Sequence, residues 1–200
     1  MDEQSFEQRS FVWAIGSFFW ELLKAFLLAM VIIVPIRYFI GQPFFVRGAS
    51  MEPNFQNGEY LVIDQLSYRL SDPKREDVVV FRYPLDESQF FIKRIVGLPG
   101  DEVRVENGQI IIVNATYPNG VVLNESQYLP AELKTGGQLS VRLGADQYFV
   151  LGDNRPASSD SRSWGPANRS EIVGRVWMRA WPFDRLQIFH SLQPSFVAAS

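Results

Sequence analysis

Two patterns of hydrophobic positions divide this chain of 200 residues. Residues 11–40 are overwhelmingly apolar and are interrupted only by the charged residues Glu21, Lys24 and Arg37. From Gly41 onward, short runs rich in β-branched and aromatic residues alternate with turn residues, as is typical of strands. We therefore expect an N-terminal apolar helix followed by a mainly β domain, with strands at 60–63, 78–81, 90–96, 102–106, 109–113, 139–143, 147–151 and 172–181.

The apolar segment predicts a transmembrane anchor over residues 18–40, because a helical crossing needs about 20 residues. Glu21 and Lys24 are close enough on a helix to pair, and Arg37 can extend toward the interface. A cleaved signal peptide fits less well, because such peptides have a basic start and a shorter apolar core, whereas this chain starts with acidic residues. A buried helix of a soluble domain is the other alternative. The flanking charges do not decide the orientation of the anchor.

Turn sequences punctuate the β region. Asn107-Gly108, between two alternating runs, is the strongest hairpin signal, and Asn57-Gly58 and Asn119-Gly120 indicate further turns. Residues 114–138 are poorer in strand-forming residues and contain prolines and a glycine pair. We predict a cytoplasmic or interfacial segment over 1–17, the anchor over 18–40, a β domain over 41–182 with a small inserted β-hairpin region over 106–146, and a C-terminal tail over 183–200.

The composition narrows the possible chemistry. The chain has no cysteine, and its single histidine, His190, lies in the predicted tail. A cysteine nucleophile is therefore impossible, and a Ser-His-Asp arrangement would depend on that tail. A formal net charge of -3 with scattered arginines gives no electrostatic footprint for nucleic acid. One histidine and no calcium-type loop give no support for a bound metal. We expect no metal, no cofactor and no nucleic-acid partner.

One lysine has the setting of a general base. Of the four lysines, only Lys93 lies within an apolar β run, on the same face as Phe91 and Ile95. Burial there lowers the pKa of an amine and lets it accept a proton near neutral pH. Ser50, which follows the apolar segment, is the candidate nucleophile. Each residue alone also has an ordinary explanation, an edge-strand lysine for one and a loop hydroxyl for the other.

Considered together, the two residues lie in blocks that resemble those of the type I signal peptidases, the bacterial Ser-Lys proteases of the S26 family. Four blocks occur in the family's order, and they lie at residues 48–53, 75–81, 91–101 and 152–162. A Ser-Met-x-Pro match alone is weak, whereas the four blocks in order are highly specific. The resemblance runs from the apolar segment to about Pro182 and so covers most of the chain.

This resemblance implies a role for each matching residue. Ser50 would be the nucleophile, Lys93 the general base, and Ser158 would orient the lysine amine through a hydrogen bond. The backbone N–H of Ser50 would donate to the oxyanion. A polar network would hold the final loop beneath the site, formed by Asp153, Arg94, Asp160 and Arg162. The candidates to wall the shallow substrate pockets are Val46, Met51, Phe55, Phe91 and Ile92.

The chain departs from the family pattern at three places. Gly48 stands where many members have a serine whose hydroxyl helps to bind the oxyanion, so the second donor near Gly48 is not identified. Ala49 replaces the usual glycine and limits the backbone angles beside Ser50. Pro156-Ala157 stiffens the approach to Ser158. We interpret these as variations within a working enzyme.

The resemblance also implies an activity and a location. We expect a membrane-bound serine endopeptidase that cleaves N-terminal signal peptides from exported preproteins after small residues of the Ala-x-Ala kind. Its partners would be those preproteins and the lipid bilayer. It would be a single-pass protein of the bacterial cell membrane with its catalytic domain on the outer face. The alternatives are a Ser-Lys self-cleaving domain of the SOS-repressor type and a membrane-tethered binding protein with an inactive site.

Overall fold

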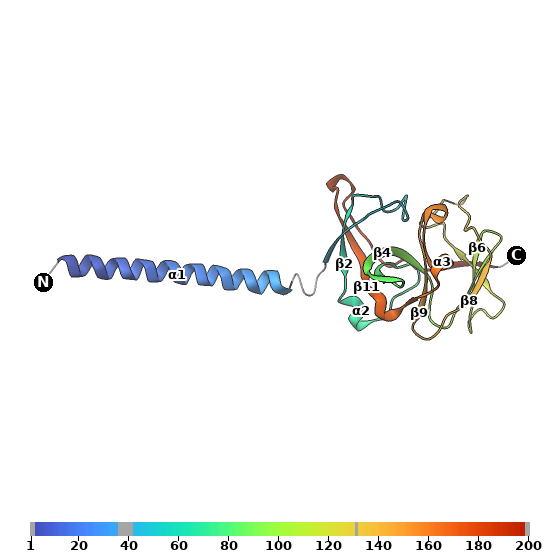
Figure 1. Cartoon of the computed structure of the whole chain (residues 1–200), viewed down its shortest axis with the longest axis horizontal. Helices are drawn as coiled ribbons and strands as arrows, with labels where there is room; N and C mark the ends of the chain where they lie inside the picture. Colours follow the sequence, from blue (N-terminus) through green and yellow to red (C-terminus); the bar gives the residue numbers. More distant parts are fainter. Residues whose placement is uncertain (1–2, 36–41, 131, 199–200) are drawn as a thin grey trace. The chain divides into compact units, whose positions relative to one another are not determined.

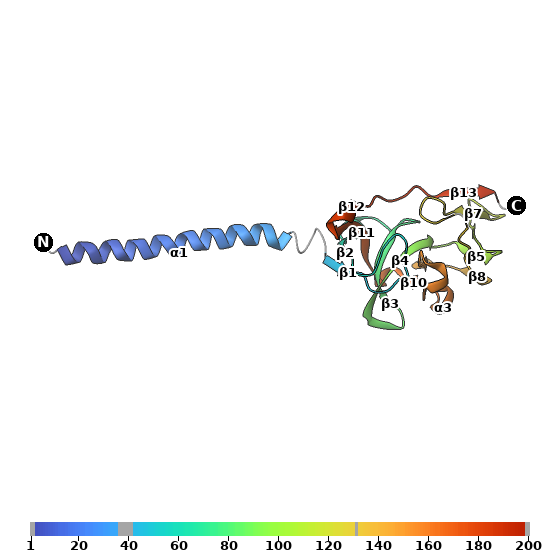
Figure 2. The same ribbon diagram turned by 90° about the horizontal axis from the view of Figure 1, so that it is seen from above.

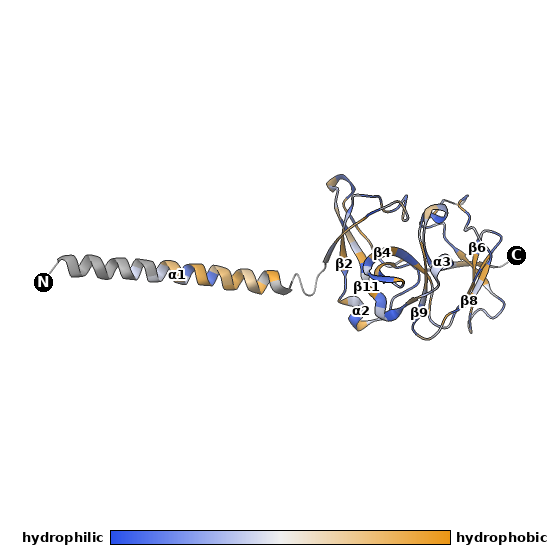
Figure 3. Cartoon of the chain, viewed as in Figure 1, coloured by the Kyte–Doolittle hydropathy of each residue, from blue (hydrophilic) through white to orange (hydrophobic). Residues whose placement is uncertain are grey.

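The computed structural model describes residues 3–35, 42–130 and 132–198, and the chain forms two compact units, residues 1–41 and residues 42–200. The first unit contains the helix α1 (Glu3–Pro35). Its second half is rich in apolar side chains that are exposed, among them Phe26, Leu28 and Val31 (Figure 3). Lys24 and Glu21 form the predicted ion pair, with 2.6 Å between Nζ and Oε1.

None of the helices in the described part of the chain combines the length and apolarity that a membrane crossing needs. The anchor expected over 18–40 coincides with α1 up to Pro35, while residues 36–40 lie outside the described residues. The anchor therefore stays a prediction.

The second unit is built on a large antiparallel sheet, shown in Figures 1 and 2. Among the described residues its strand order is β1-β2-β11-β3-β4-β9-β10, with β12 paired to β11. The strands are β1 (Gln42–Phe45), β2 (Tyr60–Asp64), β3 (Val78–Tyr83), β4 (Asp86–Gly97), β9 (Gln147–Leu151), β10 (Ala167–Asn168), β11 (Ile172–Trp181) and β12 (Gln187–Ile188).

A second antiparallel sheet has the order β13-β7-β6-β5-β8 within the described residues. Its hairpin between β5 and β6 turns at Asn107-Gly108, where both residues have positive φ, 52° and 82°, as the predicted tight turn requires. The last strand of the chain pairs with β7, so the two lie side by side in Figure 2. The strands are β5 (Glu102–Glu106), β6 (Gln109–Val113), β7 (Val121–Asn124), β8 (Leu139–Arg142) and β13 (Ser195–Ala198).

Short helices complete the second unit. They are α2 (Ser67–Leu70) and α3 (Ser161–Trp164), with the 3-10 helices η2 (Arg155–Ala157), η3 (Arg169–Glu171) and η4 (Phe183–Arg185). α3 begins after Asp160, whose side chain accepts a hydrogen bond from the N–H of Arg162 and so caps the helix.

Three buried clusters hold the β domain together. One joins the two sheets and includes Val96, Ile112 and Phe149. A second cluster takes residues from β3, β4 and β9, among them Val79, Phe81 and Val150. The third gathers residues after β1 with β2, β3 and β11, and it contains Val46, Met51, Phe55, Leu61, Ile63, Val80 and Val176. This third cluster lies directly beneath the segment that carries Ser50.

The prediction of a mainly β domain is confirmed, and each predicted strand is present to within a few residues. The region expected as an inserted hairpin, 106–146, lies within the second sheet, which also takes in β5 and β13. Residues 183–200, expected as a tail, contribute β12 and β13. β1, β7, β10, β12 and β13 were not predicted, because strands of two to four residues carry little periodic pattern; of the strands this short, β8 alone was predicted.

Candidate active site

The loop that carries Ser50 is fixed from below by its own apolar residues. Met51 and Phe55 are each 1% exposed and belong to the third cluster, and the N–H of Phe55 donates to the carbonyl of Met51 at 2.9 Å. Gly48 has a φ of +87°, a left-handed conformation that glycine adopts freely. Its N–H donates to Asn57 Oδ1 at 3.0 Å. The loop therefore turns sharply before Ser50 and leaves that residue half-buried.

Lys93 reaches the same place from the middle of β4. Its Nζ lies 2.9 Å from Ser50 Oγ and also donates to the carbonyl of Ile92 at 3.0 Å. The side chain is 3% exposed and lies over the ring of Phe91, 5.2 Å from its centroid. The predicted alternation therefore places the amine on an apolar face, next to one particular hydroxyl.

The surroundings of Lys93 favour its neutral form. Burial lowers the pKa of Lys93 from 10.5 to about 8, and the carboxylates of Asp160 and Asp153 oppose that shift only in part. A neutral amine has a lone pair and can accept the proton of a hydroxyl. The 2.9 Å contact and the lowered pKa of the amine together suit activation of a serine hydroxyl.

The loop after β9 holds the Ser50 segment from the other side. The N–H of Asn154 donates to the carbonyl of Ser50 at 3.0 Å, and its side-chain Nδ2 donates to the carbonyl of Ala49 at 3.0 Å. Gly152 packs so closely that an added Cβ would lie less than 3.0 Å from Ser158 Oγ and from the Ser50 carbonyl oxygen. Only glycine fits there without moving the backbone of Ser50.

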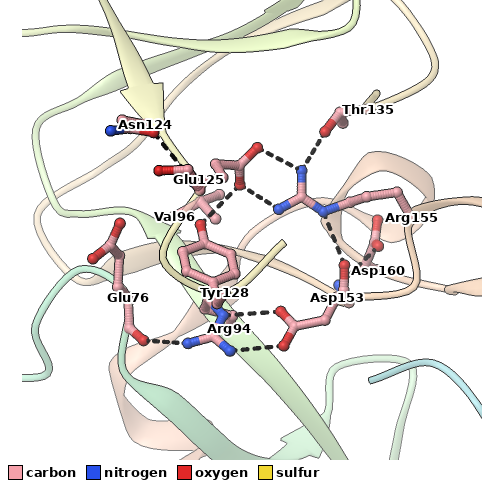
Figure 4. A network of polar contacts seen from close by, with 12 residues as sticks. Glu76, Arg94, Val96, Asn124, Glu125, Tyr128, Thr135, Asp153, Arg155 and Asp160 are labelled. Atoms are coloured by element: carbon pink, nitrogen blue, oxygen red, sulfur yellow. Dashed lines mark hydrogen bonds and ion pairs between the residues drawn. The ribbon is translucent and has the colours of Figure 1, made fainter. Parts of the chain in front are cut away.

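A buried ion pair supports that loop. Arg94 and Asp153 form two parallel hydrogen bonds, Nε to Oδ1 at 2.9 Å and Nη2 to Oδ2 at 2.7 Å (Figure 4). Asn54 Nδ2 also donates to Asp153 at 2.8 Å, and the Tyr128 ring covers the guanidinium at 4.0 Å. Because the pair is bidentate and almost fully buried, it fixes the direction of the loop relative to β4.

Two further ion pairs extend the network. Asp160 accepts from Arg162 Nε and Nη2, each at 2.8 Å, and from the N–H of Gly152 at 3.1 Å. Burial opposes ionisation of Asp160, but these hydrogen bonds prevail and lower its pKa. Arg155 binds Glu125 with both terminal nitrogens and donates to the carbonyl of Gly152 at 3.0 Å. The predicted polar residues are thus brought together, and Arg155, Glu125, Asn154 and Asn54 join them.

Ser158 lies at the site but makes no hydrogen bond to the lysine. Its Oγ is buried and without a hydrogen-bond partner in the part of the chain that the structure describes, although it is close enough to Asp160 to help lower the pKa of that carboxyl. The amine donates instead to Ser50 and Ile92. The orienting role expected for Ser158 stays a prediction.

A groove of about 500 Å³ opens beside Ser50 and Lys93. Of the five residues predicted to wall the substrate pockets, Val46, Phe91 and Ile92 line it. Met51 and Phe55 do not, because they are packed into the core beneath the loop. Phe44, Phe45, Leu61, Val80 and Phe90 complete the apolar wall. The sequence analysis did not identify these residues, because neither strand alternation nor a sequence motif distinguishes the wall of a groove from the hydrophobic core.

Within a β domain, a buried amine that contacts a serine hydroxyl beside an apolar groove defines the class of Ser-Lys hydrolases. Comparison with known proteins agrees with this class. The family model described as signal peptidase, peptidase S26 matches residues 19–181. The chain therefore belongs to the signal peptidase family, and the resemblance inferred from its four sequence blocks is confirmed.

Two relatives with signal peptidase names support the assignment. The chain is 40% identical over 172 residues to a probable signal peptidase I-2 from Synechocystis. The alignment covers 83% of this chain and 75% of that protein. It is 33% identical to signal peptidase I P from Bacillus subtilis subsp. natto, with 84% and 91% of the two chains covered. A crystal structure of a signal peptidase I from Enterococcus faecalis aligns with 53% of this chain and 97% of that one, at 28% identity and a TM-score of 0.43. The predicted activity, a peptidase that removes signal peptides from exported proteins, is confirmed by the family and these relatives.

Proposed function

We propose that this signal peptidase is a membrane-anchored serine endopeptidase in which Ser50 is the nucleophile and Lys93 the general base. The observation that carries the proposal is the 2.9 Å contact between Lys93 Nζ and Ser50 Oγ, made by a lysine that is 3% exposed. The same distance between two exposed side chains would mean little, because a solvated amine stays protonated near neutral pH.

The reaction is acyl transfer to serine. Neutral Lys93 takes the proton of Ser50 Oγ as the oxygen attacks the scissile carbonyl, and the resulting ammonium then protonates the leaving nitrogen. Water deprotonated by the same amine hydrolyses the acyl-enzyme. The Ser50 N–H is the proposed oxyanion donor. The Gly48 N–H already donates to Asn57, so we do not assign it as the second donor.

The groove suits an extended substrate with small side chains. β1 pairs with β2, and β9 pairs with β4 only between Arg94 and Gly97. Strand edges at β1 and at the first part of β4 therefore face the groove, and an extended peptide can add to them through backbone hydrogen bonds. We propose that Val46, Phe91 and Ile92 shape the shallow pockets for the residues that precede the cut.

The proposed partners are preproteins bearing signal peptides and the lipid bilayer. Family membership supports both, and so do the exposed apolar side chains of α1. The anchor over 18–40 would hold the catalytic domain, residues 41–182, at the outer face of the bacterial cell membrane. The N-terminal segment 1–17 would lie at the opposite face.

The test uses the full chain in detergent and a radiolabelled exported precursor. Ser50→Ala and Lys93→Ala should each abolish cleavage, because each removes one partner of the proton transfer. Ser126→Ala and Lys134→Ala, which change an exposed serine and an exposed lysine, are the matched controls and should cleave normally. Retained turnover in Ser50→Ala would reject the assignment. A serine-reactive penem that adds its mass to Ser50 would separate an enzyme from a binding protein with an inactive site.

A further inference from the structure

Among the described residues that line the substrate groove, Arg47 is the one side chain with a permanent charge. The other lining side chains are apolar, hydroxyl or amide groups, apart from Lys93, whose neutral form is favoured by burial. Arg47 is exposed, and its guanidinium forms no ion pair or hydrogen bond with any described residue. The groove therefore carries a positive charge and no carboxylate that balances it.

The backbone of Arg47 lies at an open strand edge. β1 is the first strand of the large sheet, and only its β2 side is paired within the described residues. Val46 continues that pairing, since its N–H donates to the carbonyl of Glu59 at 2.9 Å and its carbonyl accepts from the N–H of Gly58 at 3.0 Å. Alternate residues of a strand turn their backbone groups to opposite edges, so those of Phe45 and Arg47 face the unpaired edge. They are the groups with which an added peptide strand would pair.

The side chains of this segment alternate between two faces. Val46 is 4% exposed and packs in the third cluster. Phe45 is 45% exposed, and the guanidinium of Arg47 lies over its ring, 6.0 Å from the centroid. Phe45 and Arg47 therefore share the outer face, and Val46 points to the opposite face. The contact with the ring also holds the guanidinium close to the strand.

An extended substrate follows the same alternation. Its side chains point to the same two faces as those of the β1 residues opposite them. In the proposed binding mode, the small first and third residues before the cut enter the pockets on the Val46 face. The second and fourth residues then point to the outer face. Arg47 is nearer than Phe45 to Ser50 along the chain, so the second residue lies beside Arg47 and the fourth beside Phe45.

We propose that Arg47 is a specificity-determining residue, which favours a carboxylate side chain at the second substrate residue before the cut and disfavours an ammonium group there. The proposal rests on the function proposed above, because it takes Ser50 as the point of cleavage. Opposite charges that are neighbours on one face of paired strands attract, and like charges repel. Because Arg47 has no carboxylate partner among the described residues, a substrate carboxylate gains this contact without breaking another.

The expected preference is moderate because Arg47 is exposed. An ion pair between neighbouring strands on an exposed face favours a substrate by about two- to fivefold. Repulsion of a positively charged side chain adds a factor of similar size. We therefore expect kcat/KM for a substrate with Glu at this position to exceed that for one with Lys by about tenfold.

The experiment measures kcat/KM of the full chain in detergent with synthetic signal-peptide substrates that differ only in the second residue before the cut, which is Glu, Gln or Lys. At about pH 9 Lys93 is mostly neutral, whereas Arg47 and the substrate side chains Glu and Lys keep their charges. We expect the Glu peptide to be the best substrate and the Lys peptide the poorest. Because the contact is electrostatic and exposed, the Glu-to-Lys ratio should fall toward one in about 1 M salt.

Variants of Arg47 test whether this side chain sets the preference. Arg47→Gln should bring the Glu-to-Lys ratio close to one, Arg47→Glu should invert it, and Arg47→Lys should keep its direction. A ratio within one variant cancels any general change in activity. Arg142→Gln, which removes an exposed positive charge from β8, is the matched control and should keep the ratio of the parent.

The possible results separate this proposal from the assignment of the catalytic pair. Equal kcat/KM for the three peptides in the unaltered chain would overturn the role of Arg47 and leave Ser50 and Lys93 standing. A preference for Glu that persists in Arg47→Gln, or one that salt does not reduce, would also overturn it. The salt measurement uses the unaltered chain and so holds even if a variant folds poorly. If none of the peptides is cleaved, the proposed function fails and the role of Arg47 fails with it.

Discussion

The pH dependence of cleavage is the sharpest consequence of the Ser50–Lys93 arrangement. An amine with a pKa of about 8 is neutral in about 10% of molecules at pH 7, whereas one at its ordinary 10.5 is neutral in about 0.03%. Burial of Lys93 therefore raises the population of the active base about 300-fold at neutral pH. We expect kcat/KM to rise about tenfold from pH 7 and to level off above pH 9.

The assay measures kcat/KM on a synthetic signal-peptide substrate over this range, with viscosity controls to establish that chemistry limits the rate. Asp160→Asn is the diagnostic variant, because the Asp160 carboxylate raises the pKa of Lys93. Its removal should move the midpoint of the profile to lower pH. A rate independent of pH while chemistry limits, or a midpoint near 10.5, would refute a buried amine as the base.

The same burial has a cost in stability that can be measured separately. The folded pKa of Lys93 is lowered, so its protonated form destabilises the fold fully below about pH 8, and the cost is relieved as the pH rises from 8 to 10.5. Lys93→Met should therefore raise the free energy of unfolding at pH 7 by up to about 3 kcal/mol while abolishing cleavage. A variant less stable than the parent at pH 7 would contradict the direction of the shift.

Three further predictions concern the residues around the pair. Asp153→Ala leaves Arg94 buried without its carboxylate and should lower the free energy of unfolding, measured with urea, by about 3–5 kcal/mol. Asp153→Asn should lower it by less. Gly152→Ala should lower kcat/KM by about 100-fold with the fold retained, because the new methyl group displaces the Ser50 backbone. Normal activity would show that the loop accommodates the methyl group without moving Ser50. Glu76→Gln should be about 1–3 kcal/mol more stable than the parent above pH 7. The reason is that burial raises the pKa of Glu76 to about 7, which makes the folded parent lose stability as the pH rises from 4.5 to 7. Equal free energies of unfolding at about pH 8 would show that Glu76 is not buried as a charge.

Much of the site follows from the sequence because its residues stand out locally. Without cysteine and with one histidine, the chain offers few nucleophile and base combinations, and Lys93 is the single lysine in an apolar β run. Alternation sets the face on which a strand residue lies, so the burial of Lys93 was predictable from its neighbours. The four ordered blocks then gave the family, which the comparison with relatives confirms.

The assignment of pocket walls shows where local pattern fails. Met51 belongs to the block around Ser50 and Phe55 follows that block, yet both are packed into the core, whereas Phe44, Phe45 and Phe90 line the groove. The alternation of a strand shows which side chains share a face. It does not show whether an apolar face is covered by the protein core or lines an open groove. That distinction depends on which distant strands pack on each face.

The sequence alone determined the elements whose pattern is periodic, the mainly β class, and the residue types able to do the chemistry. Only the tertiary structure decided that β13 pairs with β7 and that Asn154 holds the carbonyl of Ser50. It also decided that the Glu76 carboxylate is buried with no hydrogen bond to any described residue. The physical reason is how far apart along the sequence the interacting residues lie. Backbone periodicity is encoded by neighbours along the chain, whereas strand pairing, hydrogen-bond satisfaction and empty space depend on residues that lie as much as 105 positions apart, as Asn154 and Ala49 do.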